Sequence, residues 1–405
     1  MNIGMVLPNS FPPDIRVEKE ARCLIEQGHK VFLLAYQKNG QLKEENVNGI
    51  HVVRVSLHNS VFWRVFRYGE FSIFKVHPEW KKHIQYFIDK FGIEILHIHD
   101  LPLVNTGITA AKRRSIPVIA DLHENYAEAV KAWNSGERSI LTKIIELPLS
   151  PSRWDKHAKT VLQKVKHIIA VIDEGKEYYH NNYKIPNDRI TVIMNTEDLN
   201  FYDSIEIKDE VIGRFSKKYI ISYIGGFGPH RGIDTAIRAM PNVIKAIPHA
   251  QLLLVGGKGS PKFESEIHAL IKDLHLEDHV HLTGWVDFSL VPSYIAASSV
   301  CLVPHHASGH TNSTIPHKLF QYMAMKKPIV TTDCIPLKRI VEETQSGIVV
   351  HSGDANEMAN AIIELYNNPD RARQYGENGR KAVEIKYNWK NEAKKLIDLY
   401  QRFIE

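Results

Sequence analysis

Short apolar runs alternate with amphipathic stretches along most of the 405-residue chain. NIGMVL and VFLLAY have the length of buried strands, and IRVEKEARCLIEQGH between them repeats its apolar residues at helical spacing. Strand, helix and strand in that order are typical of βαβ units on a parallel sheet. Further strands are expected at residues 93–99, 117–123, 167–172 and 190–195.

The alternation weakens around residue 200, where FYDSIEIKDEVIGRFSKK is charged and irregular. It resumes with YIISYIGG, a glycine-rich loop, the helical IDTAIRAMPNVIKAI and the strand-like AQLLLVGG, VHLTGW, VCLVPH, KPIVTT and SGIVVH. We therefore predict an α/β protein of two Rossmann-like, doubly wound domains, 1–200 and 201–387, facing each other across a cleft. The amphipathic segment 388–405 is expected to form a long helix that could pack back on the first domain.

Composition supports a soluble globular chain, with 43% apolar and 24% charged residues. The net charge of +5 is compatible with anionic ligands or an anionic membrane surface and is too small to indicate nucleic-acid binding. Three scattered cysteines favour neither disulfides nor a zinc ribbon. Without a long apolar run, we expect a cytoplasmic protein, or one bound peripherally to the inner face of the cell membrane.

One loop of the second half is a candidate anion site. In SYIGGFGPHRGID a strand runs into Gly225, Gly226 and Gly228, and Arg231 precedes a helix. Glycines allow close approach of the backbone to a ligand, and Arg231 adds a permanent charge suited to phosphate. A tight turn without a ligand is the alternative interpretation. The spacing is neither a dinucleotide fingerprint nor a P-loop.

STIPHKLFQYMAMKKPIV (313–330) places a second basic residue near a helix start. Pro316 is favoured in a first helical turn, and Ser313 or Thr314 could cap it, so the helix should begin near residue 315. Lys318 and Gln321 would then share an edge beside a buried face. Two helix ends with one cation each suit a pyrophosphate, whereas the alternative is a solvated surface lysine.

The chain contains no Asp-x-Asp, so a nucleotide diphosphate would have no evident divalent-metal clamp. Arg231, Lys318 and helix dipoles would have to neutralise it, and we expect no metal site and no cofactor. Histidines are abundant, with His97 and His99 on one strand and a group that could line a cleft at His305, His306, His310 and His317. His123 and Glu124 end an apolar strand, which favours a functional position over a purely structural one.

Two basic stretches have no assigned role. Residues 60–83 interleave aromatic and basic side chains, and residues 131–167 are also basic. Packing of a helical excursion with a solvated face is the plainer interpretation. The sharper one is a surface for anionic lipid or a lipid-linked acceptor.

With these residues in place, nearly the whole chain resembles retaining glycosyltransferases of the GT-B fold, family 4. FPPDIRVEKEARCLIEQGHKV resembles the first loop and helix of the family, and YIGGFGPHRGIDTAIRA resembles its donor-phosphate loop. HKLFQYMAMKKPIVTTD is similar to its donor-site helix and following strand. The order and spacing of these segments carry the resemblance.

The resemblance implies transfer of a sugar from a UDP- or GDP-type donor to a saccharide or lipid-linked acceptor, with retention, in surface polysaccharide or glycolipid synthesis. Arg231 would take the place of the phosphate-binding lysine, and His123 that of a histidine near the transferred sugar; Glu124 is a further catalytic candidate. Implied donor contacts are Gly225, Gly226, His230, Gly256, Trp285, Asn312, Ser313, Thr314 and Gln321. Implied acceptor-side residues are Asp14, Arg16 and Asp100.

The chain departs from the family pattern at three positions. Gly226 stands where the family has an arginine, and Lys318 could supply that charge. Ser313 and Gln321 stand where two glutamates are usual, although Gln321 can still bond ribose hydroxyls. A nucleotide-sugar epimerase on the same fold, or a non-catalytic nucleotide- or saccharide-binding protein, therefore remain alternatives.

Overall fold

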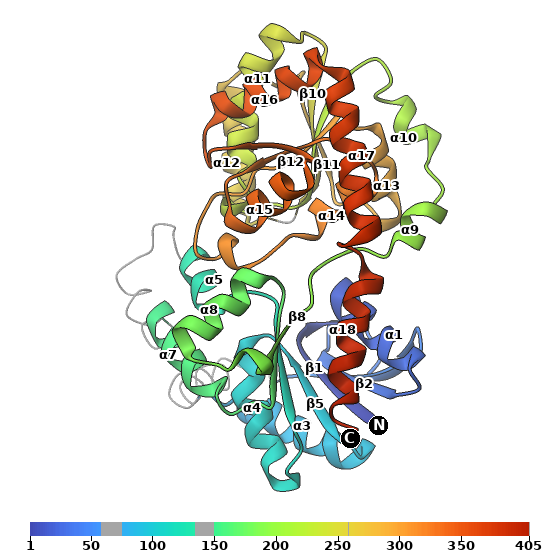
Figure 1. Cartoon of the computed structure of the whole chain (residues 1–405), viewed down its shortest axis with the longest axis vertical. Helices are drawn as coiled ribbons and strands as arrows, with labels where there is room; N and C mark the ends of the chain where they lie inside the picture. Colours follow the sequence, from blue (N-terminus) through green and yellow to red (C-terminus); the bar gives the residue numbers. More distant parts are fainter. Residues whose placement is uncertain (58–74, 134–149, 258, 405) are drawn as a thin grey trace. The chain divides into compact units, whose positions relative to one another are not determined.

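The structure is a computed structural model that describes residues 1–57, 75–133, 150–257 and 259–404. The chain forms two compact units, the first made of Met1–Met194 with Ala393–Glu405 and the second of Asn195–Glu392 (Figure 1). In the described ranges no helix is both long and apolar enough to span a bilayer.

The first unit is built on an eight-stranded sheet in the order β3-β4-β2-β1-β5-β6-β7-β8. All neighbouring strands are parallel except the β3–β4 pair. The strands are β1 (Asn2–Ser10), β2 (Lys30–Tyr36), β3 (Glu44–Val47), β4 (Ile50–Val55), β5 (Ile95–His99), β6 (Val118–Leu122), β7 (His167–Ala170) and β8 (Ile190–Val192). β5, β6 and β7 are buried along their whole length, as expected of central parallel strands covered by helices.

The helices of the first unit are α1 (Ile15–Glu26), α3 (Pro78–Phe91), α4 (Leu101–Ala111), α5 (Tyr126–Trp133), α7 (Pro151–Val161), α8 (Asp173–Tyr183) and most of α18 (Trp389–Gln401). Side chains of α3, α4, α7 and α8 pack with the sheet in one apolar core. α18 buries Leu396, Leu399 and Tyr400, and Figure 1 shows both chain ends on this unit. The Tyr400 hydroxyl lies 2.8 Å from His97 Nδ1 on β5, which ties the C-terminal helix to the middle of the sheet.

The antiparallel β3–β4 hairpin was not among the predicted strands. Asn48 and Gly49 form its turn with φ of 51° and 86°, the pair of positive angles that a two-residue type I′ turn requires. The Asn-Gly pair was the available signal, and the polar, exposed EENV strand masked it.

The second unit carries a six-stranded, fully parallel sheet in the order β11-β10-β9-β12-β13-β14. Its strands are β9 (Tyr219–Gly226), β10 (Ala250–Gly257), β11 (Val280–Gly284), β12 (Val300–Val303), β13 (Ile329–Thr332) and β14 (Gly347–Val350). Its helices are α9 (Leu199–Ser204), α10 (Asp209–Gly213), α11 (Ile233–Ala246), α12 (Pro261–Asp273), α13 (Val291–Ala297), α14 (His317–Ala324), α15 (Ile335–Thr344), α16 (Ala355–Asn367) and α17 (Pro369–Ile385). One core joins this sheet to α11, α12 and α16.

Strand order identifies where each unit can bind a ligand. In the first unit β1 separates β2 from β5, and in the second β9 separates β10 from β12. At such points successive connections leave in opposite directions, and the carboxyl ends of the strands open into a crevice. The loops after β1 and β5, and those after β9 and β12, are therefore the places to look for sites.

Candidate functional site

The loop after β9 is shaped by close approach of backbone and side chains. Gly225 has φ of 138°, and a Cβ there would lie 2.9 Å from Lys318 Nζ. At Gly232, with φ of 66°, a Cβ would lie 1.7 Å from the Pro304 carbonyl oxygen after β12. At Gly232 a side chain would prevent the two loops at the switch point from meeting, and at Gly225 the positive φ favours glycine. Nearby, Gly226 accepts a hydrogen bond from the Tyr223 hydroxyl at 2.7 Å, and Gly256 has φ of 118°.

Lys318 on α14 is the most unusual side chain of this site. It is 6% exposed, and its Nζ lies 3.7 Å from the centre of the Tyr223 ring. Within the described residues Nζ has no hydrogen-bond partner and no carboxylate. Burial, and then the charge of Arg231, hold the pKa of Lys318 well below its ordinary value.

Arg231 ends the short turn Pro229–Arg231 just before α11. Its Cγ lies 3.9 Å from the Cβ position of Gly228, and its charge acts on Lys318, His230 and His310. Its side chain makes no hydrogen bond or ion pair to any described residue. Two basic groups therefore lie at one switch point with no carboxylate of the described residues against either, an arrangement suited to an anionic ligand.

Three histidines lie near these cations, and burial and the charge of Arg231 lower the pKa of each. Burial first, and then Arg231, lower the pKa of His230 to about 3 and that of His310 to about 4, and hold the pKa of His305 well below its usual value. The rings of His230 and His310 lie 5.2 Å apart. His230 and His305 each leave a buried Nε2 without a partner among the described residues. His306 differs, because its Nε2 lies 3.0 Å from Asp234 Oδ1.

The helix α14 starts at a different residue from the one predicted. α14 begins at His317, after Pro316, and neither Ser313 nor Thr314 caps it. Residues Thr311–Ser313 form a separate turn, and the Ser313 hydroxyl donates to the carbonyls of Gly309 and His310. The capping prediction was wrong because serine also satisfies carbonyls of a preceding turn.

The expected buried face of α14 is confirmed, but burial also extends to the edge that carries the polar side chains. Every residue from Lys318 to Ala324 is buried, so Lys318 and Gln321 lie inside the unit. Gln321 Nε2 lies 3.3 Å from Glu197 Oε1, and His317 Nδ1 lies 2.9 Å from the same oxygen. Glu197 was missed by sequence reasoning, since it stands in a linker segment without periodicity. The contact of Gln321 with ribose stays a prediction.

The remaining donor candidates of the second unit have varied positions. Asn312 Oδ1 accepts a hydrogen bond from Ile335 N at 2.9 Å, so it supports the start of α15. The Trp285 side chain is 63% exposed after β11. Thr314 is half-buried in extended backbone. None of these observations tests a donor contact.

In the first unit, a charged network lies at the carboxyl ends of β5 and β6. Arg16 from α1 holds Asp121 with two hydrogen bonds, Nε to Oδ2 at 3.0 Å and Nη2 to Oδ1 at 2.7 Å. Asp121 Oδ2 also lies 3.0 Å from His99 Nδ1 and 3.0 Å from His123 Nε2. Asp100 Oδ2 lies 3.7 Å from the other nitrogen of His123. Asp121 is thus the centre of the network, and sequence reasoning missed it because a buried strand position gave no sign of function.

The network makes His123 a cation at neutral pH. Burial alone would lower the pKa of His123, but the carboxylates of Asp100 and Asp121 outweigh it and raise the pKa to about 10. Burial would raise the pKa of Asp121, yet Arg16 and His123 hold it well below its usual value. His99 behaves in the opposite way, since burial lowers its pKa to about 3. His123 is therefore equipped to donate hydrogen bonds rather than to act as a base.

Four buried side chains of the first unit have possible metal-ligand atoms within 4.8 Å of one another. They are Glu20, His97, His99 and Asp121. Arg16 Nη2 lies 3.0 Å from Glu20 Oε1 and also holds Asp121. A divalent ion would have to share both carboxylates with this guanidinium, so the donor set fits a metal poorly. We interpret the group as a charge network, and the expectation of no metal site stays a prediction.

Two acceptor-side and catalytic candidates have structural contacts. Asp14 caps α1 by accepting a hydrogen bond from Val17 N at 3.1 Å. Glu124 is half-buried, and its backbone carbonyl accepts a hydrogen bond from the Tyr179 hydroxyl at 3.4 Å. Parts of the two possible lipid-facing stretches, residues 60–74 and 134–149, lie outside the described residues.

The two units, each with a parallel sheet and helices, define Rossmann-like domains of the GT-B fold. Two family models match the chain, Glycosyltransferase Family 4 over residues 15–201 and Glycosyl transferases group 1 over residues 204–382. The chain belongs to this family of glycosyltransferases.

Relatives cover the chain nearly end to end. It is 21% identical over 407 residues to a phosphatidyl-myo-inositol mannosyltransferase of Mycobacterium leprae, covering 99% of this chain and 96% of the relative. Sucrose-phosphate synthase from Thermosynechococcus elongatus has the same fold with a TM-score of 0.80 at 20% identity, covering 100% of this chain and 99% of that one. Anabaena Alr3699/HepE, solved in complex with UDP-glucose, has a TM-score of 0.75 at 14% identity, covering 99% of this chain and 100% of that one.

Proposed function

We propose that this glycosyltransferase uses a nucleotide-diphosphate sugar as its donor and transfers the sugar with retention of anomeric configuration. The observation that carries the proposal is a pair of basic side chains, Lys318 and Arg231, at the switch point of the second unit, which have no carboxylate partner within the described part of the chain. A diphosphate supplies the charges that this pair lacks. The UDP-glucose complex of a protein with the same fold supports this donor class.

In the proposed reaction the bond between the anomeric carbon and the donor phosphate oxygen breaks, and the phosphate keeps the electron pair. The acceptor hydroxyl oxygen bonds to the anomeric carbon, and its proton passes to the departing phosphate. Lys318 and Arg231 stabilise the growing negative charge, which replaces the metal of other nucleotide-sugar enzymes. No carboxylate is required as a base, and the cationic His123 serves as a hydrogen-bond donor to the sugar.

We further propose a saccharide or lipid-linked acceptor bound by the first unit, in surface polysaccharide or glycolipid synthesis. Asp14, Arg16 and Asp100 are the proposed acceptor-side residues. The curated mannosyltransferase relative is named for a phosphatidyl-myo-inositol substrate, which supports an acceptor that carries lipid.

The donor class can be tested by a thermal-shift screen of nucleoside diphosphates and their sugars, followed by turnover of each hit with and without an acceptor. We expect a UDP- or GDP-type nucleotide to raise the melting temperature by mass action. Hydrolysis or transfer of its sugar should be unchanged by EDTA, because the proposed cations belong to the chain. Conversion of the donor sugar without release of nucleotide would indicate an epimerase, and binding without turnover a non-catalytic protein. Loss of activity in EDTA would contradict the metal-free mechanism.

A second expectation concerns protons. Burial, and then the charge of Arg231, hold the pKa of Lys318 well below its ordinary value in the free protein. A bound diphosphate favours the charged form and raises that pKa, so nucleotide binding should be accompanied by proton uptake at a pH between the pKa values of the free and the bound protein. Calorimetry in buffers of different ionisation enthalpy measures this uptake. It should vanish in a Lys318→Met variant and decline at lower pH, where the free amine is already protonated. Uptake unchanged in that variant would exclude Lys318 as the source.

A further inference from the structure

A cavity lies in the first unit at the amino ends of strands β6 and β7, opposite the ends that carry the charged network. It has a volume of about 980 Å³ and is lined at the start of β6 by Val118 and at the start of β7 by His167. His99 and His123 lie at the other ends of their strands. The cavity is therefore distinct from the candidate catalytic residues, which all lie at carboxyl ends of strands or in the second unit.

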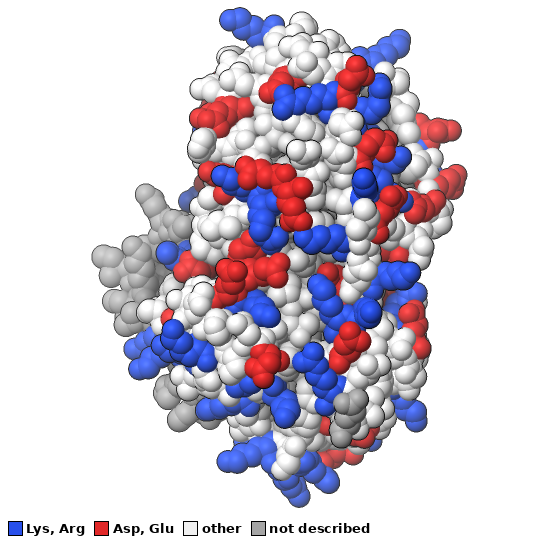
Figure 2. Space-filling model, viewed as in Figure 1, with Lys and Arg blue, Asp and Glu red and all other residues white. Residues whose placement is uncertain are grey.

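The cavity is strongly basic. Lys112, Lys164, Lys166 and Arg402 line it, whereas Asp188 is its one acidic lining residue. None of these four cationic side chains makes a hydrogen bond or ion pair to any described residue. Figure 2 shows Lys and Arg predominating at the lower end of the displayed face, over the same unit. Uncompensated cations from separate elements are the arrangement that binds an anion with several oxygens.

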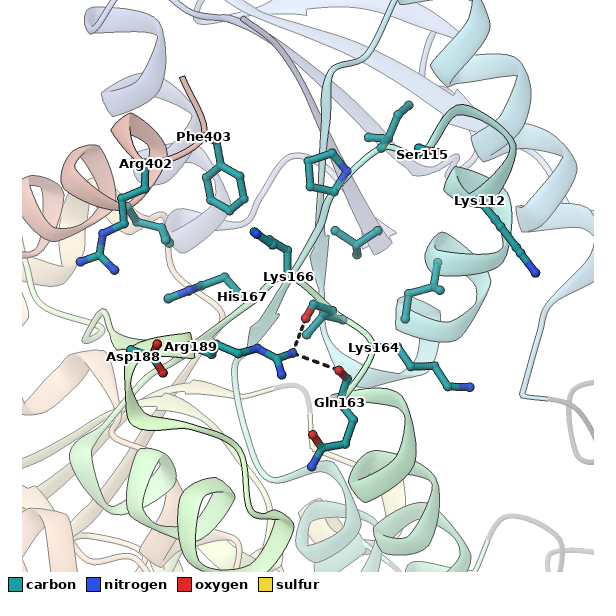
Figure 3. A pocket seen from close by; sticks show the side chains of 16 residues that line it. Lys112, Ser115, Gln163, Lys164, Lys166, His167, Asp188, Arg189, Arg402 and Phe403 are labelled. Atoms are coloured by element: carbon teal, nitrogen blue, oxygen red, sulfur yellow. Dashed lines mark hydrogen bonds between the residues drawn. The ribbon is translucent and has the colours of Figure 1, made fainter. Parts of the chain in front are cut away.

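The elements that supply these cations are far apart in sequence. Lys112 follows α4, Lys164 and Lys166 stand in the segment between α7 and β7, and Arg402 follows α18. Figure 3 shows Lys166 in the middle of the pocket near Phe403 and His167, with Arg402 on one side and Lys112 and Lys164 on the other.

A fifth basic residue, Arg189, is already in use. Its Nη2 donates to the carbonyl oxygens of Gln163 at 3.1 Å and of Val165, so it holds the segment that carries the two lysines. His167 Nε2 lies 2.9 Å from Thr191 Oγ1. Burial first, and then Arg402 and Arg189, lower the pKa of His167 to about 4, so this wall of the cavity stays neutral. Arg189 and His167 thus hold the walls of the cavity in place, and the other four cations are available to bind an anion.

The floor of the cavity is apolar. Ile116, Pro117, Leu399 and Phe403 line it beside the cations. A free inorganic anion would leave this apolar surface uncovered, whereas a phosphate ester with an attached hydrocarbon chain would bury it. The basic stretch 131–167 contributes Lys164 and Lys166, and this assigns a use to a sequence feature that the transfer reaction does not require.

We infer that this cavity binds a phosphate-bearing amphiphile, with the phosphate between Lys166 and Arg402 and the hydrocarbon against Phe403. Such a ligand can come from a membrane lipid or from a soluble phosphate ester. The binding site is separate from the donor site, so it can be tested independently of the proposed function.

The test uses the full chain with two probes. Dihexanoyl phosphatidic acid represents a soluble ligand in calorimetry, with dihexanoyl phosphatidylcholine and inorganic phosphate as comparisons. Vesicles of phosphatidylcholine, with and without phosphatidic acid, represent a membrane in a sedimentation assay. The variants are Lys166→Glu/Arg402→Glu, the matched control Lys217→Glu/Lys218→Glu with the same change of net charge on the second unit, and Lys318→Met to remove a donor-site cation.

We expect the pocket variant to weaken binding of the phosphatidic acid probe by at least about tenfold, because two charge-assisted contacts are lost. The Lys217/Lys218 control and Lys318→Met should bind as the wild type does. Pocket-dependent binding of the short-chain probe alone indicates a soluble ligand, and pocket-dependent sedimentation with acidic vesicles indicates a membrane lipid. Equal loss in pocket and control variants, equal affinity for inorganic phosphate, or no binding of either probe would overturn the inference.

Discussion

Replacing Lys318 by methionine is expected to reduce transfer about 100- to 1000-fold while leaving the protein folded and at least as stable. The Nζ of Lys318 is the buried cation proposed to meet the leaving diphosphate, and loss of one such group typically has this effect on kcat. Methionine fills a similar volume and removes a buried amine that has no hydrogen-bond partner, so the free energy of unfolding should rise by about 1 kcal/mol. Turnover of the nucleotide sugar and urea unfolding measure the two effects.

Lys327 provides the matched control. It is a half-buried lysine of the same unit, and its Nζ donates to the carbonyl oxygens of Ala296 at 2.7 Å and Ser298 at 2.8 Å. Lys327→Met should therefore lose stability and keep nucleotide affinity, the reverse of Lys318→Met. Arg231→Ala should resemble Lys318→Met in its loss of transfer. Full activity of either donor-site variant would remove the assignment of these residues to the diphosphate.

The largest loss of stability is expected at Arg16. Arg16→Met removes the guanidinium that holds Asp121 by two hydrogen bonds, contacts Glu20 and donates to the Ile193 carbonyl oxygen at 2.9 Å. A buried charge left without its partner typically costs about 3–5 kcal/mol. Urea unfolding should show this decrease in the free energy of unfolding. Transfer should also fall, because the Asp121 carboxylate beside His123 is no longer held in place by Arg16.

Two comparisons separate this effect from a general loss of charge. Arg22→Met, on the exposed face of the same helix, should change stability by less than about 0.5 kcal/mol. The Arg16→Met variant leaves the Asp121 carboxylate without its guanidinium, and Asp121→Asn removes that carboxylate. The double variant Arg16→Met/Asp121→Asn should therefore recover part of the lost stability without restoring transfer. If Arg16→Met proved as stable as the wild type, the ionic description of this network would be wrong.

Periodicity in the sequence predicted most of the fold because parallel strands buried on both faces are short, apolar and nearly continuous. The predicted strands at 93–99 and 117–123 correspond to β5 and β6, and YIISYIGG and AQLLLVGG correspond to β9 and β10. The β3–β4 hairpin was missed, since its first strand is polar and exposed. Helix boundaries were predicted less accurately. At α14, Ser313 was expected to cap the helix, but its hydroxyl donates to carbonyls of the preceding turn instead.

The candidate site was predicted only in part. The glycines and the arginine in the loop after β9 could be recognised from the sequence, because both residue types are typical of anion-binding loops between a strand and a helix. Asp121, Glu197 and Tyr223 give no comparable signal, because a carboxylate or an aromatic ring in a strand or linker acquires its role only from what faces it. The cavity that contains Lys166 and Arg402 was even less predictable from the sequence, because its walls come from segments separated by more than half of the chain.

By itself, the sequence determined that this chain forms two α/β domains and carries basic residues in the loop and helix of the proposed donor site. Local periodicity and residue chemistry are sufficient for that. Only the tertiary structure decided that Lys318 is buried with no hydrogen-bond partner among the described residues, that Asp100 and Asp121 raise the pKa of His123, and that four cations line one cavity beside apolar side chains. These properties depend on burial and on distances between segments remote in sequence, and electrostatic energy depends on both.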